Sequence, residues 1–264
     1  MKLDETTIRD LEIFEASGQS VFSIVDRTAT EGGHVALRTR FREPSSDLED
    51  IARTQRIVRH FTDHPLAFFP LREQVRSAQR YLSANIETAS RRGAVASRLQ
   101  AWWTRARYRD LLDELQRGVR ATVQLLREVH ALHEAIEASN PPQEVRALVG
   151  EWSSAFENSR VVALLHTPEW LKPLHLLRVD RMLRHDLAPT MSAMFTTLFE
   201  LDALHAMATA TREGGYVFPE LVSGEFVIEA EGVVHPFVQG AVPNGIRLAD
   251  GRTLLFLTGP NMGG

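Results

Sequence analysis

The sequence predicts a mainly α protein: an elongated helical domain over residues 1–213, followed by a small β-rich region over residues 214–264. Two observations support this division. Residues 95–138 contain no proline and carry apolar side chains at a seven-residue spacing, which is typical of a long helix packed on partner helices. After Gly214-Gly215 the chain changes to glycine, proline and short β-branched or aromatic runs, which are typical of strands and turns.

The composition is that of a globular protein. Hydrophobic residues make up 44% of the 264 residues and charged residues 24%, which argues against a disordered chain. The net charge of −4 provides no overall basic field, so any contact with nucleic acid must come from a local patch. The absence of cysteine excludes disulfides and thiolate metal sites. Since no secretory signal or membrane-spanning run stands out, we expect a cytoplasmic protein with no membrane partner.

Caps and breakers predict the N-terminal helices. Asp4 is expected to cap a first helix, because its carboxylate can accept the free N–H groups of the first turn. The Gly32-Gly33 pair is expected to break the next helical segment. Asp47, at the end of a Ser-Ser-Asp run, supplies cap chemistry for a helix that continues through about Phe61.

The longest helix is predicted over residues 95–138. The Pro-Pro pair at 141–142 ends it, and two further helices are expected over residues 143–158 and 175–210. The second of these is expected to bend at Pro189, because proline cannot donate an interior hydrogen bond. The apolar seam of the long helix consists of Leu112, Leu115, Val119, Leu126, Val129 and Ile136.

Three short runs in the C-terminal region are predicted strands: residues 226–230, 245–248 and 253–258. The last run is almost entirely apolar, which is typical of a strand buried on both faces of a sheet. It leads into six residues that match the first six positions of the phosphate-binding loop G-x-x-x-x-G-K-[ST]. These residues are Gly259, Pro260, Asn261, Met262, Gly263 and Gly264.

In such a loop the backbone N–H groups cradle phosphate oxygens, the lysine neutralises the β- and γ-phosphates, and the hydroxyl residue holds Mg²⁺. The lysine and the hydroxyl residue would occupy the two positions after Gly264. We therefore expect ATP and Mg²⁺ to be cofactors of a longer parent protein. This chain alone is expected to bind neither and to hold no catalytic residue. A flexible tail is the alternative interpretation of the two spaced glycines.

Residues 258–264 resemble the phosphate loop of the MutS family of mismatch-repair ATPases, T-G-P-N-M-[GS]-G-K-[ST]. Residues 3–12 resemble the family's opening L-D-x-x-T-x-x-N-L-E, with Asp10 in place of the asparagine. Residues 23–30 continue this match, and residues 201–204 are similar to the end of the family's last core helix. The resemblance therefore brackets both ends of the chain and is weak in between.

The resemblance implies that residues 1–213 form a MutS-like core and lever domain with a reduced or absent clamp, and that residues 214–264 are the first strands of a P-loop ATPase domain. It also implies a parent protein that couples ATP binding to duplex DNA through its lever helices, as a homodimer. This chain, without most of the ATPase domain, is expected to be monomeric. Met262 would pack near the adenine and Phe237 would offer it an aromatic ring; for Phe237, a core position under a strand is the alternative.

Two other functions stay open at this point. The acidic net charge and the short interval for a clamp favour a non-catalytic helical interaction protein of MutS descent. The recombination-suppressing branch of the family also lacks the mismatch-reading domain, although residues 3–12 resemble the repair-type core better. The tripeptide Phe41-Arg42-Glu43 echoes the mismatch-reading motif, but a structural phenylalanine on a helix is the stronger interpretation.

The segment from Thr88 to Arg109 contains no acidic residue and includes Trp102-Trp103. Guanidinium groups suit phosphate oxygens and indoles stack on bases, so this segment is a candidate contact to the DNA backbone. A solvated helix face with two packed tryptophans is the alternative. The candidate contact residues are Arg91, Arg92, Arg98, Arg105, Arg107 and Arg109.

Two histidine pairs have spacings that place both rings on one helix face: His60 with His64, and His130 with His133. No carboxylate stands near either pair in a metal-site pattern, and such spacings arise by chance among ten histidines. We therefore expect no metal site. No nucleophile elbow of the G-x-S-x-G type is present, so we expect no nucleophilic triad.

Overall fold

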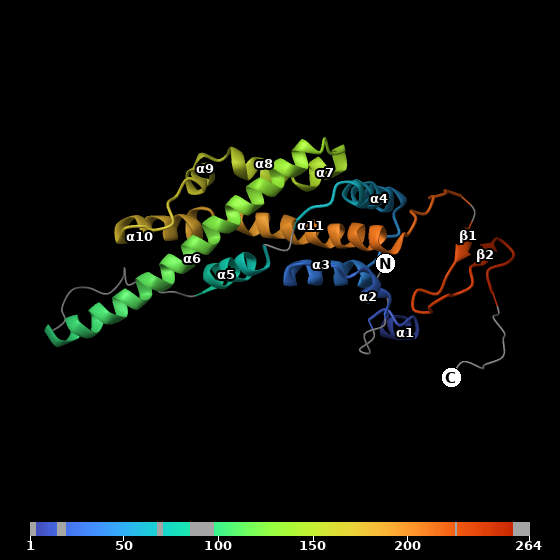
Figure 1. Ribbon diagram of the computed structural model, residues 1–264, viewed down its shortest axis with the longest axis horizontal. Coiled ribbons are helices and arrows are strands. Elements are labelled where there is room, and N and C mark those ends of the chain that lie inside the picture. The colour runs from blue at the N-terminus through green and yellow to red at the C-terminus, as the bar shows by residue number, and fades with distance from the viewer. Residues whose placement is uncertain (1–3, 15–19, 68–70, 85–97, 225, 256–264) are drawn as a thin grey trace.

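In the computed structural model, helices run along the elongated molecule and a two-stranded hairpin lies at one end (Figure 1). The predicted fold class, a mainly helical protein followed by a small β region, is confirmed. The structure describes the backbone of residues 4–14, 20–67, 71–84, 98–224 and 226–255, and the side chains of these residues except 71 and 98–108.

The elements follow one another in this order along the chain. The helices are α1 (Glu5–Asp10), α2 (Val21–Val25), α3 (Glu31–Arg42), α4 (Leu48–Asp63), α5 (Leu71–Ser83), α6 (Arg98–Ala138), α7 (Gln143–Leu148), α8 (Gly150–Glu157), α9 (Ser159–Leu165), α10 (Pro173–Arg181), the π-helix η1 (Met182–Asp186) and α11 (Ala188–Gly214). The strands are β1 (Val227–Val233) and β2 (Asn244–Ala249).

The predicted caps of α1 and α4 are confirmed. The Asp4 carboxylate accepts a hydrogen bond from the backbone N–H of Thr7 at 2.9 Å, and the Asp47 carboxylate accepts one from the N–H of Asp50 at 2.8 Å. Each cap satisfies one of the N–H groups that a helix leaves free in its first turn. These two helices therefore begin where the local sequence predicts.

The predicted long helix is confirmed as α6, which has 41 residues. Five of its six seam residues are buried in the main core, and Leu112 is half-buried. Helix α5, which the sequence analysis did not predict, lies beside α6 (Figure 1). The single glycine within α6, Gly118, marks this contact, because a Cβ there would lie 2.2 Å from Cδ2 of Tyr81 on α5.

The prediction that Gly32-Gly33 breaks a helix is wrong. Both glycines lie in the first turn of α3, where they let α3 approach α11 closely. A Cβ on Gly33 would lie 2.1 Å from Oδ2 of Asp202, and one on Gly32 would lie 2.4 Å from the ring of Phe199. The glycines allow close packing against α11, a helix that is distant in sequence. Rules that read only neighbouring residues cannot predict such a contact.

Two helix predictions after α6 need correction. The segment 143–158 forms two helices, α7 and α8, and a third helix, α9, follows them unpredicted. The interruption expected at Pro189 occurs earlier, at Leu187, which separates the end of η1 from the start of α11. Pro189 itself lies in the first turn of α11, where its missing N–H costs no intrahelical bond.

Two of the three predicted strands are confirmed. β1 and β2 pair in antiparallel fashion, with a bulge between Ala230 and Val233, and Glu229 lies opposite Arg247. The third predicted strand, residues 253–258, is wrong for residues 253–255. These have no strand structure, and Leu254 is 74% exposed instead of buried. Residues 256–258 lie outside the described part of the chain.

We predict that Gly33→Ala lowers the free energy of unfolding by about 1–3 kcal/mol, because the added methyl group overpacks the α3–α11 contact. Gly150→Ala is the matched control, since a Cβ at Gly150 meets nothing within 4 Å. That control should leave stability unchanged or raise it by at most about 1 kcal/mol, through helix propensity. Urea unfolding of both variants measures the difference. Equal effects at the two positions would contradict the assigned contact.

Candidate functional site

The central polar contact of the helical part is a buried carboxylate on α11. Asp202 is 1% exposed, and its Oδ1 accepts a hydrogen bond from the N–H of Ala29 at 3.0 Å. Its Oδ2 accepts from the N–H and the hydroxyl of Thr30, at 2.8 and 2.7 Å. The Thr30 hydroxyl in turn accepts from the N–H of Gly33 and caps α3. One side chain thus holds the start of α3 against α11.

The charge of Asp202 has no arginine or lysine partner among the described contacts. Burial raises the pKa of Asp202, although the hydrogen bonds from Ala29 and Thr30 oppose this rise. The carboxylate also lies at the N-terminus of α3, where the helix dipole favours negative charge. Aligned N–H groups and one hydroxyl therefore solvate this carboxylate in place of water.

A buried histidine lies one turn further along α11. His205 Nε2 lies 3.0 Å from the backbone nitrogen of Leu66, so the ring accepts that N–H in its neutral form. Burial first, and then the positive charge of Arg212, lower the pKa of His205 to about 4. The ring also meets Phe61 of α4 edge-on, at 6.4 Å between centroids. His205 therefore ties the segment after α4 to α11 without carrying charge at neutral pH.

The end of α11 is tied to the neighbouring segments. Glu213 accepts a hydrogen bond from Nε of Arg27 at 2.8 Å. Beyond the left-handed residue Gly215, the carbonyl of Pro219 accepts from the Gln55 side chain of α4 at 3.1 Å. The guanidinium of Arg59, also on α4, lies 4.8 Å from the ring centroid of Phe218. The connection from α11 toward the hairpin is therefore held on α4.

A polar groove of about 470 Å³ separates α5 from the segment that joins α2 to α3. Asp26 and His34 pair on one wall, with Oδ2 and Nδ1 2.7 Å apart. Burial acts to raise the pKa of Asp26, but hydrogen bonds from Thr28 and from His34 outweigh burial and the pKa lies below its ordinary value. The groove is lined by Asp26, Thr28, Thr30, Glu31, His34, Arg72, Val75, Arg76 and Gln79.

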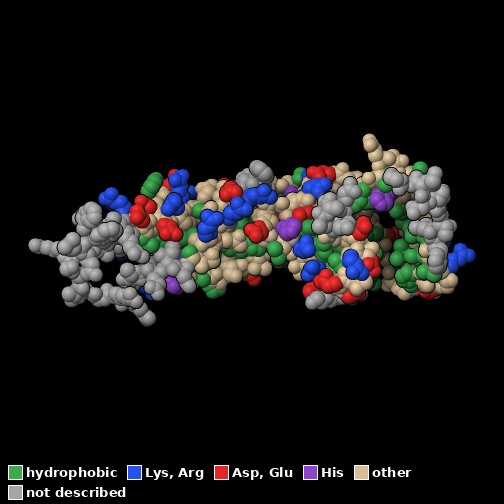
Figure 2. Space-filling model, turned by 90° about the horizontal axis from the view of Figure 1, so that it is seen from below, with side chains coloured by type: hydrophobic (Ala, Val, Ile, Leu, Met, Phe, Trp, Pro, Cys, Tyr) green, Lys and Arg blue, Asp and Glu red, His purple; other side chains and the backbone are tan. Residues whose placement is uncertain are grey.

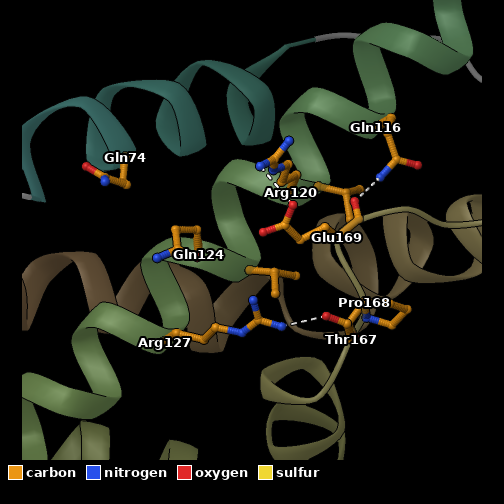
Figure 3. Close-up of a pocket in the computed structure, with 10 residues that line it drawn as sticks. Gln74, Gln116, Arg120, Gln124, Arg127, Thr167, Pro168 and Glu169 are labelled. Carbon is orange, nitrogen blue, oxygen red and sulfur yellow. Dashed lines mark hydrogen bonds and ion pairs between the residues drawn. The ribbon is translucent and has the colours of Figure 1, made fainter.

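A second cavity, of about 360 Å³, lies between α6 and the segment that follows α9 (Figure 3). Most of its polar side chains are already engaged within the chain. Arg127 donates to the carbonyls of Leu165 and Thr167, at 2.9 and 2.5 Å. Gln116 donates to the carbonyl of Glu169 and accepts from the N–H of Leu171. These contacts fasten the segment to α6, so the cavity is best explained as a structural joint.

Sequence reasoning missed a buried cluster where α5 meets α10 and η1. The Tyr81 hydroxyl donates to Asp180 at 2.6 Å, and Arg184 lies 3.3 Å from the same carboxylate. Arg184 also donates to the carbonyls of Tyr81 and Ala84. Burial, and then the contact with Asp180, raise the pKa of Tyr81, so the phenol stays protonated. The single glycine of α6, Gly118, is a sequence signal for the approach of Tyr81 to α6, but not for its partners Asp180 and Arg184.

Most of the residues predicted to bind nucleotide lie outside the described part of the chain. This applies to the whole loop, residues 259–264. Phe237, the predicted adenine contact, lies in the turn between β1 and β2, is 37% exposed and packs edge-on against His235. It is not a core residue under a strand. No contact described for Phe237 tests its predicted role.

The predicted arginine contacts are equally incomplete. Arg91 and Arg92 lie outside the described residues, and only the backbone is described for Arg98, Arg105 and Arg107, all on α6. Arg109 is exposed on α6. The start of α6 and the hairpin that carries Phe237 lie at opposite ends of the molecule (Figure 1). The structure therefore does not bring the two predicted sites together.

The other candidates have structural roles. Phe41 packs against the rings of Phe14 and Phe22, which supports its interpretation as a core side chain. His60 and His133 each contact a serine hydroxyl, at 3.0 Å. Among the described residues, no group of three His, Cys, Asp or Glu side chains is arranged to hold a metal ion. No helix in the described part of the chain is long and apolar enough to span a membrane.

We predict that His205 makes the fold sensitive to acid. The unfolded chain binds the proton near pKa 6.5 and the folded chain near 4, so the unfolded state takes it up first as the pH falls. Stability from this group is complete above about pH 6.5 and decreases toward about pH 4. Between about pH 7 and pH 5 the loss is about 2 kcal/mol.

His205→Gln provides the comparison for this prediction, because it removes the titrating ring and keeps an acceptor near the N–H of Leu66. Urea unfolding of both proteins at the two pH values should show a smaller loss for the variant. His60 and His133 also have pKa values lowered by burial, but they are present in both proteins. An identical pH dependence in the two proteins would remove His205 as the cause.

Three relatives illustrate the similarity to known proteins. The DNA mismatch repair protein MutS of Geobacillus thermodenitrificans is 40% identical over 82 residues, 29% of this chain and 9% of that relative. MutS of Paracoccus denitrificans is 38% identical over 82 residues, which are 30% of this chain and 9% of that relative. MutS of Oleidesulfovibrio alaskensis is 36% identical over 97 residues, which are 33% of this chain and 11% of that relative. The chain thus spans about a tenth of the length of the curated relatives it matches.

The match to a family model is longer. The family described as MutS domain III matches residues 6–208, which include most of α1, all of α2 to α10 and most of α11. Asp202, Thr30 and Gly33, the residues that join α3 to α11, all lie within the matched region. On this evidence the chain belongs to the MutS family, through its domain III.

Proposed function

We propose that the chain is the core and lever part of a MutS-like DNA mismatch repair protein, which couples ATP binding to the engagement of DNA. The observation that carries this proposal is the match of residues 6–208 to MutS domain III. The relatives that share this similarity are DNA mismatch repair proteins by name. ATP with Mg²⁺ would bind at the loop of residues 259–264, on the strength of its sequence pattern.

The packing supports a mechanical role for the helices. A movement of the segment that follows α11 would act on α4 through Gln55 and Arg59. A movement of the last turn of α11 would act on the α2–α3 segment, because Glu213 accepts a hydrogen bond from Arg27. The Asp202 contact would carry it along α11 to α3. The 41 residues of α6 amount to a rod of about 60 Å, long enough to act at a distant point.

The proposed DNA contact is the arginine-rich segment 88–109, whose described part, from Arg98 on, is the start of α6; its arginines would meet backbone phosphates. Each phosphate contact releases condensed counterions, so the affinity for a duplex should fall steeply as salt is added. This salt dependence distinguishes a backbone contact from a solvated helix face.

We predict that the chain binds a homoduplex at low salt and that the affinity falls linearly with salt on logarithmic axes. Fluorescence anisotropy of a labelled duplex measures this slope. The triple variant Arg105→Gln, Arg107→Gln, Arg109→Gln should reduce the slope by about 0.9 for each arginine that contacts a phosphate. The control, Arg146→Gln with Arg160→Gln, changes exposed arginines on α7 and α9 and should leave the slope unchanged. A flat salt response in the wild-type chain would exclude the proposed contact.

A non-catalytic interaction protein is the second candidate function, and one observation favours it. Trp170 is 72% exposed and Leu174 is 76% exposed, between α9 and the start of α10. Exposed tryptophan is enriched at the centres of protein interfaces. The same titration separates the two candidates, because an interaction protein whose DNA role has lapsed would bind no duplex even at low salt.

The homodimer is proposed for the whole protein, and this chain is proposed to be a monomer. Most of the described large apolar residues of α4, α6, α8 and α11 are buried in the chain's own core, which supports a monomer. We predict that sedimentation equilibrium gives a mass near 29.7 kDa. A concentration-independent mass of twice that value would contradict the proposal.

A further inference from the structure

Helix α5 carries a row of arginines on its exposed face. Arg72, Arg76 and Arg80 are spaced four residues apart and are all exposed, while Val75, Ala78 and Tyr81 are buried on the other side of the helix. Residues four apart lie on the same face of a helix, so the three guanidinium groups form one line. Figure 2 shows Lys and Arg side chains gathered along the lower face of the molecule, over α5 and beside the start of α3.

The partners of these arginines leave the row available. Arg72 uses its Nε–H on the carbonyl of Ala29, at 2.7 Å, and keeps the other donors of its guanidinium. Arg76 has Glu73 at 3.7 Å, an exposed pair whose stabilisation is small. No ion pair or hydrogen bond is described for the side chain of Arg80 within the described part of the chain. Two of the three guanidinium groups can therefore meet a ligand without breaking a buried contact.

The row borders the polar groove of about 470 Å³, whose α5 wall includes Arg72, Arg76 and Gln79. The acidic groups of the groove, Asp26 and Glu31, lie on the opposite wall, and Asp26 is engaged by Thr28 and His34. An anionic ligand would therefore follow the exposed face of α5 instead of entering the groove.

The remaining exposed residues of α5 favour the backbone of a duplex over other classes of ligand. They are Glu73, Ser77, Gln79 and Ser83, so the described part of the helix exposes no aromatic or large aliphatic side chain. A protein partner would need such an anchor, and single-stranded nucleic acid is bound by aromatic stacking platforms. The backbone of a duplex needs neither, because its phosphates are read by charge and by hydrogen-bond donors alone.

We propose that the arginine row of α5 is a second contact for the phosphate backbone of duplex DNA, separate from the start of α6. Steps of four residues give a spacing of about 6 Å and a row of about 12 Å. One strand of a duplex carries a phosphate about every 3.4 Å of helix axis, so the row faces about three phosphates. The inference rests on the proposed function, since it requires that the chain binds duplex DNA.

The test is the double variant Arg76→Gln, Arg80→Gln, with Arg72 retained because it holds Ala29. The probe is a labelled homoduplex of about 30 base pairs, followed by anisotropy across a salt series from about 50 to 200 mM. Loss of two phosphate contacts should lower the salt slope by about 1.8 and weaken binding at low salt. The charge-conserving variant Arg76→Lys, Arg80→Lys should keep most of the slope. Arg146→Gln with Arg160→Gln is the matched control and should behave as wild type.

The outcomes separate the two proposals. If the wild-type chain binds no duplex at low salt, the DNA contact of the proposed function fails and this inference fails with it. If the wild type binds and the double Gln variant keeps the full slope, only the assignment to α5 is overturned. Tighter binding of the single strand of the same sequence would overturn the choice of duplex. All variants change exposed side chains, so thermal unfolding should match that of the wild type.

Discussion

The arrangement of the helical part depends on one interaction, the solvation of the Asp202 carboxylate by the start of α3. A buried charge without hydrogen-bond donors would cost several kcal/mol, on the order of the whole stability of a domain. The N–H groups of Ala29 and Thr30 can meet this need only when α3 starts at one position against α11. The carboxylate therefore sets the register of two helices that are far apart in sequence, and the close approach it demands explains the two glycines of α3.

Further contacts extend from this point. Ala29 donates its N–H to Asp202, and its carbonyl accepts a hydrogen bond from Arg72 of α5. Helix α5 is therefore held against the segment that joins α2 to α3. His205, one turn along α11, accepts from the N–H of Leu66 and fixes the segment that follows α4. Asp202 and His205, neighbouring residues of α11, thus position the α2–α3 segment and helix α5. They thereby also position the groove between these two elements. A surface that would bind DNA is connected in this way to the helix that leads toward the hairpin.

Local signals predicted the elements whose causes are local. The caps at Asp4 and Asp47 and the seam of α6 follow from residues within a few positions of one another, and the structure has them. The function of Gly33 could not be predicted, because its cause, Asp202, lies on a helix more than 160 positions away. The Tyr81–Asp180 contact was missed for the same reason. Two segments that resemble family motifs, residues 23–30 and 201–204, do meet at this carboxylate. The family motifs therefore indicated a long-range contact that the spacing of apolar residues did not indicate.

The net charge of −4 is no obstacle to two basic contacts on one chain. At physiological salt the field of an exposed charge is screened within about 8 Å, so a phosphate on α5 responds to Arg76 and Arg80 and hardly to acidic residues elsewhere. What matters is whether neighbouring carboxylates are engaged. Asp202 and Asp26 both direct their oxygens at hydrogen-bond donors of their own chain. On α5 itself three arginines outnumber the single glutamate, Glu73, so the exposed face of this helix carries a net positive charge.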